Sequence, residues 1–345
     1  MPIAGSFASF RRSPSSENGK LRKRFKRLSK LLVAMLLLSM VIIDGCASKG
    51  VHRGTDPSQA ARSGPKVLAV WMPWFGDHKH IDVGYSSQDP QVMRRQIKEA
   101  VDRNISAFVV DWYGERRPFH DKSFALLQQV ASEMHFQVAL MYDETENDNG
   151  QATDEALAAF DKAYKAYIGP QARYGDAYLS YQGRPVVFIF PKRGGTDWNR
   201  VREKLNAWSS PPLLIYKDEP AAEFARTFDG YYAWIHPGHG GWASDGSDWG
   251  EQYLDNFYKN MTTKHADKIA VGAAWPGFDD SRASWGLNRH MDARCGKTFE
   301  ETLGFYRRYY SDSNTLPFLL IETWNDYEEG TAVERASFTN CNHPS

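Results

Sequence analysis

The sequence predicts a single α/β domain over residues 66–345, folded as a (β/α)8 TIM barrel. Eight short apolar runs, rich in β-branched and aromatic residues, alternate with amphipathic segments of helical period. Near-continuous apolarity is typical of parallel strands that are buried on both faces, and eight such units suit a barrel of about 250 residues. An open doubly wound sheet is the alternative, but it usually has fewer strands, and no G-x-G-x-x-G turn follows the first run.

Each expected strand is four to seven residues long, and expected helices lie between the strands. The strands are Val67–Met72, Ala107–Trp112, Gln137–Tyr142, Pro185–Phe190, Leu213–Tyr216, Tyr231–Ile235, Ile269–Trp275 and Pro317–Thr323. The helices are at residues 89–104, 121–134, 153–168, 196–209, 219–228, 249–265 and 297–311. Asp89 is a good N-cap and Pro90 suits the first turn, so the first helix should begin there. Because little chain follows the eighth run, we expect the eighth helix to be short or missing.

Residues 1–45 have the pattern of a signal peptide. Nine basic residues and one acidic residue precede a 13-residue apolar run, Leu31–Ile43, and a second acidic residue follows it. As a helix, this run is too short to cross a hydrocarbon core of roughly 30 Å. Ile43-Asp44-Gly45-Cys46 resembles a bacterial lipoprotein cleavage box. We therefore expect an exported protein that is either a cell-envelope lipoprotein anchored through Cys46, or a secreted or periplasmic protein. Residues 47–65 are polar and typical of a flexible linker.

Charge and cysteine content limit the partners. The whole chain has 42 basic and 42 acidic residues, but without the leader 33 basic residues face 40 acidic ones. A mildly acidic body argues against nucleic acid as a partner. Cys295 and Cys341 either form a disulfide or remain two thiols. No Cys/His spacing is typical of a zinc site, so we expect no metal, no cofactor, and a monomer that contacts membrane through its lipid anchor alone.

The expected strand ends are rich in carboxylates and aromatic side chains. In a (β/α)8 barrel the active site lies at the carboxyl ends of the strands, and indole faces with carboxylates complement the apolar faces and hydroxyl edges of sugars. Single aromatic residues can equally fill the barrel mouth. We expect the loop at residues 237–250 to cover a substrate. The expected substrate-binding residues are Trp74, Phe75, Asp111, Trp112, Tyr113, Tyr142, His236, Trp275, Glu322, Trp324 and Asn325, with Trp74, Trp112, Trp275 and Trp324 lining the cleft.

Several of these segments resemble motifs of known glycoside hydrolases. Pro73-Trp74-Phe75-Gly76 is similar to the P-W-Y-G that follows the first strand of glycoside hydrolase family 99. The motifs at residues 85–90 (YSSQDP) and 111–114 (DWYG) resemble its Y-S-S-x-D-P and W-W-G. The segment at 325–331 (NDYEEGT) resembles its N-E-W-x-E-G-T, while TWNDY at 323–327 is similar to family 71. The resemblance covers residues 66–114 and 317–334 and indicates the family 71/99-like group.

This resemblance implies a (β/α)8 glycosidase that acts on an α-linked glycan or polysaccharide. Family 99 comprises endo-α-mannosidases and α-mannanases, and family 71 comprises α-1,3-glucanases. By position, Glu329 corresponds to the family 99 acid/base, and Asp326 to the base that helps the 2-hydroxyl of the sugar attack. Asp326 is one methylene shorter than the family Glu, so direct inversion also stays open.

The spacing of Asp326 and Glu329 favours the same pair independently. Side chains three residues apart share a face if the chain turns helically there. Two close carboxylates repel, so one should hold its proton to higher pH, as a general acid must. The alternative is that both acids lie in a solvated first turn of a helix.

Two other functions compete with that of an exported glycosidase. A sugar-binding surface lipoprotein on the same barrel, without turnover, would show the same aromatic residues. A periplasmic solute-binding protein would need two α/β lobes, and a single series of eight units argues against it.

Overall fold

The computed structural model describes residues 64–146 and 150–335, and in this range eight parallel strands form a closed ring. The expected signal peptide, Cys46, nearly all of the linker and Cys341 lie outside the described residues. Pairing of β1 with both β2 and β11, and of β3 with β5, closes the ring, so the predicted (β/α)8 barrel is confirmed. Its strands are β1 (Lys66–Trp71), β2 (Ile105–Trp112), β3 (Gln137–Asp143), β5 (Arg184–Phe190), β6 (Leu213–Lys217), β7 (Gly230–Tyr232), β8 (Ile269–Ala274) and β11 (Phe318–Ile321).

The strands are buried on both faces, as their apolar sequences predict. In β2, Phe108, Val109 and Val110 all have no exposed surface. Each fully buried side chain of this kind contributes roughly 1.5–3 kcal/mol of transfer free energy. Alternate residues of a strand point to opposite faces, so one set fills the barrel and the other contacts the surrounding helices.

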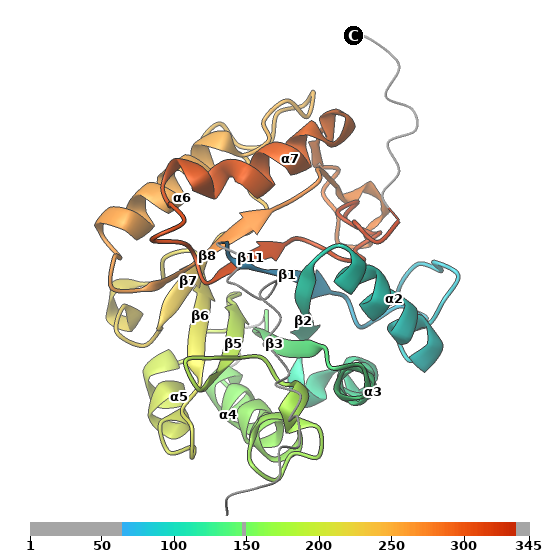
Figure 1. Ribbon diagram of the computed structural model, residues 1–345, viewed down its shortest axis with the longest axis vertical. Coiled ribbons are helices and arrows are strands. Elements are labelled where there is room, and N and C mark those ends of the chain that lie inside the picture. The colour runs from blue at the N-terminus through green and yellow to red at the C-terminus, as the bar shows by residue number, and fades with distance from the viewer. Residues whose placement is uncertain (1–63, 147–149, 336–345) are drawn as a thin grey trace, which may run out of the picture. The chain divides into compact units, whose positions relative to one another are not determined.

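Six α-helices surround the strands in the described part of the chain (Figure 1). They are α2 (Pro90–Asp102), α3 (Pro118–Met134), α4 (Ala152–Ala163), α5 (Trp198–Leu205), α6 (Glu251–Thr263) and α7 (Lys297–Gly304). The Asp89 side chain accepts a hydrogen bond from the backbone N–H of Gln91, which caps α2 at the predicted place. As expected, residues 322–335 after β11 contain no helix.

The predicted helix at residues 219–228 is wrong. Only one turn of 3-10 helix, η5 (Ala222–Phe224), connects β6 to β7. The Lys268 amino group donates to the carbonyls of Ala225 and Phe228, at 3.0 and 2.9 Å, and Arg202 Nε donates to the Thr227 carbonyl at 2.7 Å. These side chains satisfy backbone acceptors that a helix would otherwise use, so the segment stays irregular.

Two short hairpin pairings extend the barrel. β4 (Ser180–Tyr181) pairs antiparallel with β5, and β9 (Phe278–Asp279) pairs antiparallel with β10 (His290–Met291). The chain between β9 and β10 is held by Asp280, whose buried carboxylate accepts hydrogen bonds from the backbone N–H groups of Leu287 and Arg289. This β9–β10 loop therefore has a defined position above the carboxyl end of β8.

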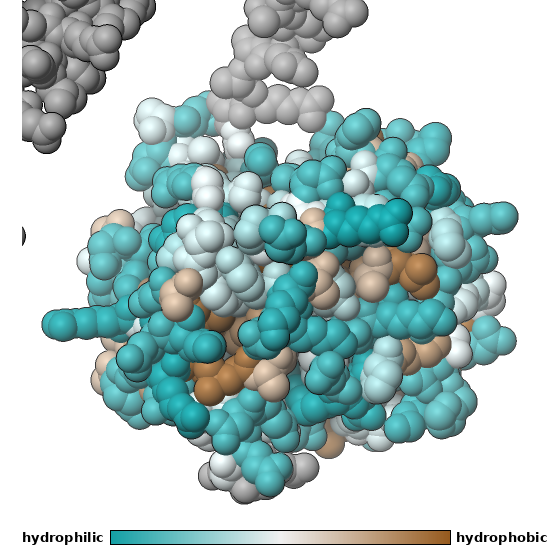
Figure 2. Space-filling model, turned by 90° about the horizontal axis from the view of Figure 1, so that it is seen from below, coloured by the Kyte–Doolittle hydropathy of each residue, from teal (hydrophilic) through white to brown (hydrophobic). Residues whose placement is uncertain are grey.

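The surface of the described residues is largely hydrophilic. The face in Figure 2 shows hydrophobic residues mainly in small patches between polar side chains. Among large hydrophobic residues of the described part only Val101, Trp285 and Leu287 are strongly exposed. No helix within residues 64–146 and 150–335 is long and apolar enough to span a bilayer.

Candidate active site

A cavity of about 640 Å³ opens at the carboxyl ends of the barrel strands. Every barrel strand, or the segment directly after it, contributes to the lining, which is the arrangement expected of a (β/α)8 active site. The contributions in strand order include Trp74, Asp111, Asp143, Lys192, Lys217, Trp234, Phe278 and Asp326.

The segment after β11 is a tight turn that carries two carboxylates into the cavity. Asn325 is fully buried; its Oδ1 accepts from the Met72 N–H at 2.7 Å and its Nδ2 donates to the Met72 carbonyl at 3.1 Å. Asp326 Oδ1 accepts from the backbone N–H groups of Glu328 and Glu329, both at 2.9 Å. These bonds fix the turn against the end of β1, and both Asp326 and Glu329 line the cavity.

The carboxyls of Asp326 and Glu329 are electrostatically coupled. Burial and the nearby Glu329 charge hold the pKa of Asp326 well above its usual range. Burial also raises the pKa of Glu329, while Trp285 Nε1, which donates to Glu329 Oε1 at 2.8 Å, and the Arg289 guanidinium oppose that rise. Both carboxyls are therefore protonated to higher pH than exposed acids would be.

Trp285 favours the ionised form of Glu329, whereas Asp326 Oδ2 is buried without a hydrogen-bond partner in the described chain. Of the two carboxyls, Asp326 is therefore the one whose surroundings more strongly favour the protonated form. Substrate must change this balance if Glu329 is to act as the acid.

Two further carboxyls, of Asp111 and Asp143, line the cavity beside the amino group of Lys192. Burial raises the pKa of Asp111 to about 6, although Lys192 and a 2.9 Å hydrogen bond from the Tyr113 hydroxyl favour its ionised form. Burial, and then the Asp111 charge, raise the pKa of Asp143 well above its usual range. Lys192 Nζ lies 3.3 Å from Asp143 Oδ1. The cavity therefore combines proton-holding acids with cationic groups at its wall.

An aromatic group forms one side of the cavity. The rings of Trp74 and His80 are stacked, with centroids 4.8 Å apart and an interplanar angle of 10°. Trp285 meets Trp74 edge-on at 6.0 Å, and His80 Nδ1 is held by Glu328 Oε2 at 2.8 Å. Sugar rings bind well to such surfaces because their C–H faces are apolar.

Four of the eleven expected substrate-binding residues line the cavity: Trp74, Asp111, Tyr113 and His236. The others lie in the core, so their expected place in the cleft is corrected; these are Phe75, Trp112, Tyr142, Trp275, Glu322, Trp324 and Asn325. Trp112 follows Asp111 directly and so points to the opposite face of the strand. Its Nε1 donates to Asp121 Oδ1 at 3.1 Å, on the helix side of β2.

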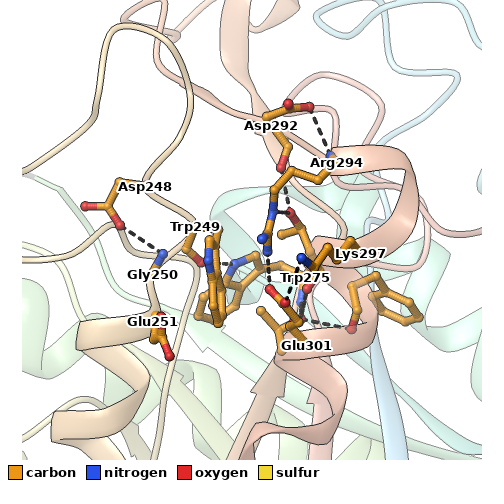
Figure 3. Close-up of polar contacts among 12 residues, drawn as sticks. Asp248, Trp249, Gly250, Glu251, Trp275, Asp292, Arg294, Lys297 and Glu301 are labelled. Atoms are coloured by element: carbon orange, nitrogen blue, oxygen red, sulfur yellow. Dashed lines mark hydrogen bonds and ion pairs between the residues drawn. The ribbon is translucent and has the colours of Figure 1, made fainter. Parts of the chain in front are cut away.

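Trp275 and Trp324 are also held inside the protein by contacts with other buried groups. Trp275 Nε1 donates to the carbonyl of Trp249 at 3.0 Å, and Arg294 lies 4.9 Å above the Trp249 ring (Figure 3). Trp324 contacts Phe108, with ring centroids 5.3 Å apart. In the expected covering loop at residues 237–250, Trp242 lines the cavity and Trp249 does not.

Sequence reasoning missed several residues of the cavity wall, among them His120, Trp285 and Arg289. The β9–β10 loop carries Trp285 and Arg289, and His120 lies in the first turn of α3. A tryptophan in the otherwise small and polar segment SRASWG was the one available signal for this loop.

No group of three or more potential metal ligands occurs in the described ranges 64–146 and 150–335. Cys295 is disulfide-bonded. Its expected partner Cys341 lies outside the described residues, so the pairing of these two cysteines stays a prediction.

Two tryptophan variants test which indoles face the ligand. Trp74→Ala should weaken glycan binding by about 1–2 kcal/mol, because it removes an aromatic surface from the cavity wall. The Trp74 ring is also buried against His80, so the variant should lose some folding free energy as well. Trp112→Ala should instead cost about 3–5 kcal/mol of folding free energy, since it leaves a hole between β2 and its helices. Calorimetric titration and urea unfolding measure the two effects. Equal binding loss in both, at unchanged stability, would contradict this placement.

Glu322→Gln is expected to stabilise the protein at neutral pH. Burial raises the pKa of Glu322 well above its usual range, outweighing the Ile235 backbone N–H and the Lys217 charge. Because the pKa of Glu322 is higher in the folded than in the unfolded chain, ionisation of this carboxyl destabilises the fold. The stability that its protonated form provides is fully present below the unfolded pKa of about 4.3, and it is lost as pH rises through the folded pKa. The melting-temperature gain of the variant should therefore be larger at pH 7 than at pH 4.5. A variant that melts lower than wild type at pH 7 would refute this.

No protein-family model and no curated protein matches this chain. Solved structures do: a GH99 endo-α-mannosidase from Bacteroides thetaiotaomicron in complex with bis-tris-propane has a TM-score of 0.59 and 18% identity, covering 78% of this chain and 86% of that one. A glycoside hydrolase-like protein has a TM-score of 0.56 and 16% identity, covering 79% and 88%. These likenesses confirm the barrel fold that the sequence resemblance to family 99 implied.

Proposed function

We propose that this protein is a glycoside hydrolase that cleaves an α-linked glycan or polysaccharide of the α-mannan or α-glucan type. The observation that carries the proposal is the coupled pair of Asp326 and Glu329 in the cavity at the carboxyl ends of the strands. Glycosidic cleavage needs one carboxyl that holds a proton and a second that acts as base or nucleophile. Trp74 in the cavity wall supports a sugar ligand, and the fold likeness to an endo-α-mannosidase supports the same class of reaction.

In the proposed mechanism Glu329 is the acid/base. Trp285 holds its Oε1, which leaves Oε2 to pass a proton to the departing glycosidic oxygen. Asp326 Oδ1 is used by the turn, so Oδ2 is the oxygen that accepts a proton, either from the 2-hydroxyl of the sugar as that hydroxyl attacks, or from an attacking water. In the first route an epoxide-like intermediate forms, and a water that gives its proton to Glu329 then opens it, so two displacements retain the anomeric configuration. In the second route a single displacement by water inverts it.

The alternative function is that of a non-catalytic sugar-binding protein. One observation favours it: both hydrogen bonds of the turn use Asp326 Oδ1, and the Asp326 side chain is one methylene shorter than the Glu of the resembling motif. Glycan binding by wild type that equals binding by Glu329→Gln, with no product released by either, would support this alternative.

A substrate screen tests the proposed function. The purified protein is incubated with α-mannans, α-1,3-glucans and other plant or microbial polysaccharides, and product size is measured. We expect one α-linked class to be cleaved, and the product size then distinguishes endo from exo action. Binding to several glycans without any product would contradict the hydrolase function.

We also propose that the protein is exported and held in the cell envelope by a lipid on Cys46. The basic leader, the short apolar run and the cysteine that follows it support this proposal. Labelling of cells with an alkyne fatty acid should mark the wild-type protein and not the Cys46→Ser variant. An unlabelled protein in the culture medium would favour plain secretion instead.

A further inference from the structure

A second, smaller hollow of about 210 Å³ adjoins the main cavity. His236 and Pro237 line both, so the two spaces lie on either side of this part of the chain. The remaining walls come from the end of β6, from β7 and from one side of α6. A barrel helix would normally lie between β6 and β7, and the one-turn η5 takes its place.

The walls of this hollow combine aromatic rings with hydroxyl-binding groups. Tyr253 and Phe257 of α6 lie along it, and the Tyr253 hydroxyl donates to Asp218 Oδ1 at 2.5 Å. The His236 ring lies against the Tyr253 ring, with centroids 4.9 Å apart. At the rim, the Asn256 amide is within hydrogen-bond distance of His239 Nε2, at 3.1 Å. Ring faces bordered by amides and carboxylates are the groups that bind sugars.

The size and charge of the hollow restrict its ligand further. It has about a third of the volume of the main cavity and lies below the range of about 300–1,000 Å³ that is usual for a complete small-molecule site. Its described lining includes Asp218 and Glu219, three histidines of which His265 lies 3.3 Å from the Glu219 carboxylate, and no lysine or arginine. Two carboxylates disfavour an anionic ligand, so the hollow suits one neutral, hydroxyl-rich ring.

We propose that this hollow is an accessory subsite that binds one further neutral sugar unit of the glycan whose neighbouring units occupy the main cavity. The proposal rests on the proposed function, because it takes the main cavity to hold the same glycan. It predicts that polymers or branched chains bind more tightly than disaccharides, which reach only the main cavity.

Three single variants test the subsite. Asn260→Trp fills the hollow from α6, and His239→Ala removes the exposed partner of Asn256 at the rim. Lys259→Ala is the matched control, since Lys259 is the exposed neighbour of Asn260 on α6 and does not line the hollow. Binding of soluble α-mannan and α-1,3-glucan, and of the matching disaccharides, is measured by calorimetry, with thermal melting as a check of folding.

Asn260→Trp should weaken binding of the polymer that wild type binds by roughly tenfold, the loss of one stacked ring, and His239→Ala should weaken it several-fold. Disaccharide binding by these two variants, and polymer binding by the control Lys259→Ala, should equal those of the wild type. If Asn260→Trp does not fold, the exposed His239→Ala decides alone. Polymer binding at wild-type strength in the folded variants would overturn the subsite.

Binding is measured independently of turnover, so the two proposals can fail separately. A wild-type protein that binds polymer without cleaving it contradicts the hydrolase function, while the variants still decide on the subsite. A wild-type protein that binds none of the glycans overturns both proposals.

Discussion

Replacement of Glu329 by Gln is expected to lower turnover of the natural glycan by about 10²- to 10⁴-fold. The amide keeps the size of the side chain and an oxygen that accepts from Trp285 Nε1, but it has no proton to give to the departing oxygen. A substrate with a good leaving group needs no such proton, so its turnover should fall much less. Comparison of kcat for the natural glycan with kcat for an activated aryl glycoside measures this difference.

Glu328→Gln is the matched control for this variant. The Glu328 carboxylate holds His80 and the Ile81 N–H and does not line the cavity. Its replacement should alter protein stability without changing how strongly kcat depends on the leaving group of the substrate. Near wild-type turnover of natural glycan by Glu329→Gln, with inactive Glu322 or Glu328 variants, would show that the acid has been wrongly assigned.

Asp326→Asn is expected to lower turnover by about 10²- to 10⁴-fold for both kinds of substrate. Asparagine retains an Oδ1 that can accept from the Glu328 and Glu329 N–H groups, so the turn should persist. The base, however, is lost, and every substrate requires it for the attack on the anomeric carbon. Steady-state kinetics with both substrates, together with the melting temperature, separates a catalytic loss from unfolding.

The opposite pattern would reverse the two roles. If Asp326→Asn is impaired with natural glycan alone, and Glu329→Gln with both substrates, then Asp326 is the acid. That outcome would agree with the surroundings of Asp326, which favour the protonated form of its carboxyl. The anomer first released, followed by NMR, then distinguishes retention through the 2-hydroxyl from inversion by water.

The sequence alone determined the barrel and the segments that carry its chemistry. Eight apolar runs predicted all eight parallel strands because a strand buried on both faces has no polar alternation. Asp89 and Pro90 marked the start of α2 because they supply the cap and the backbone angle of a first turn. Asp326 and Glu329 could be placed in the cavity because residues after parallel strands meet at one end of the barrel.

Tertiary structure decided which side chains at those strand ends reach the cavity. Asp111 and Trp112 are neighbours in β2, yet one faces the cavity and the other the helices, and the register that sets this depends on pairing with β1 and β3. Trp285 reaches Glu329 only because buried Asp280 holds the loop that carries it. The segment at 219–228 stays irregular because side chains distant in sequence, Arg202 and Lys268, bind its carbonyls. Such contacts join residues far apart along the chain, so no local pattern encodes them.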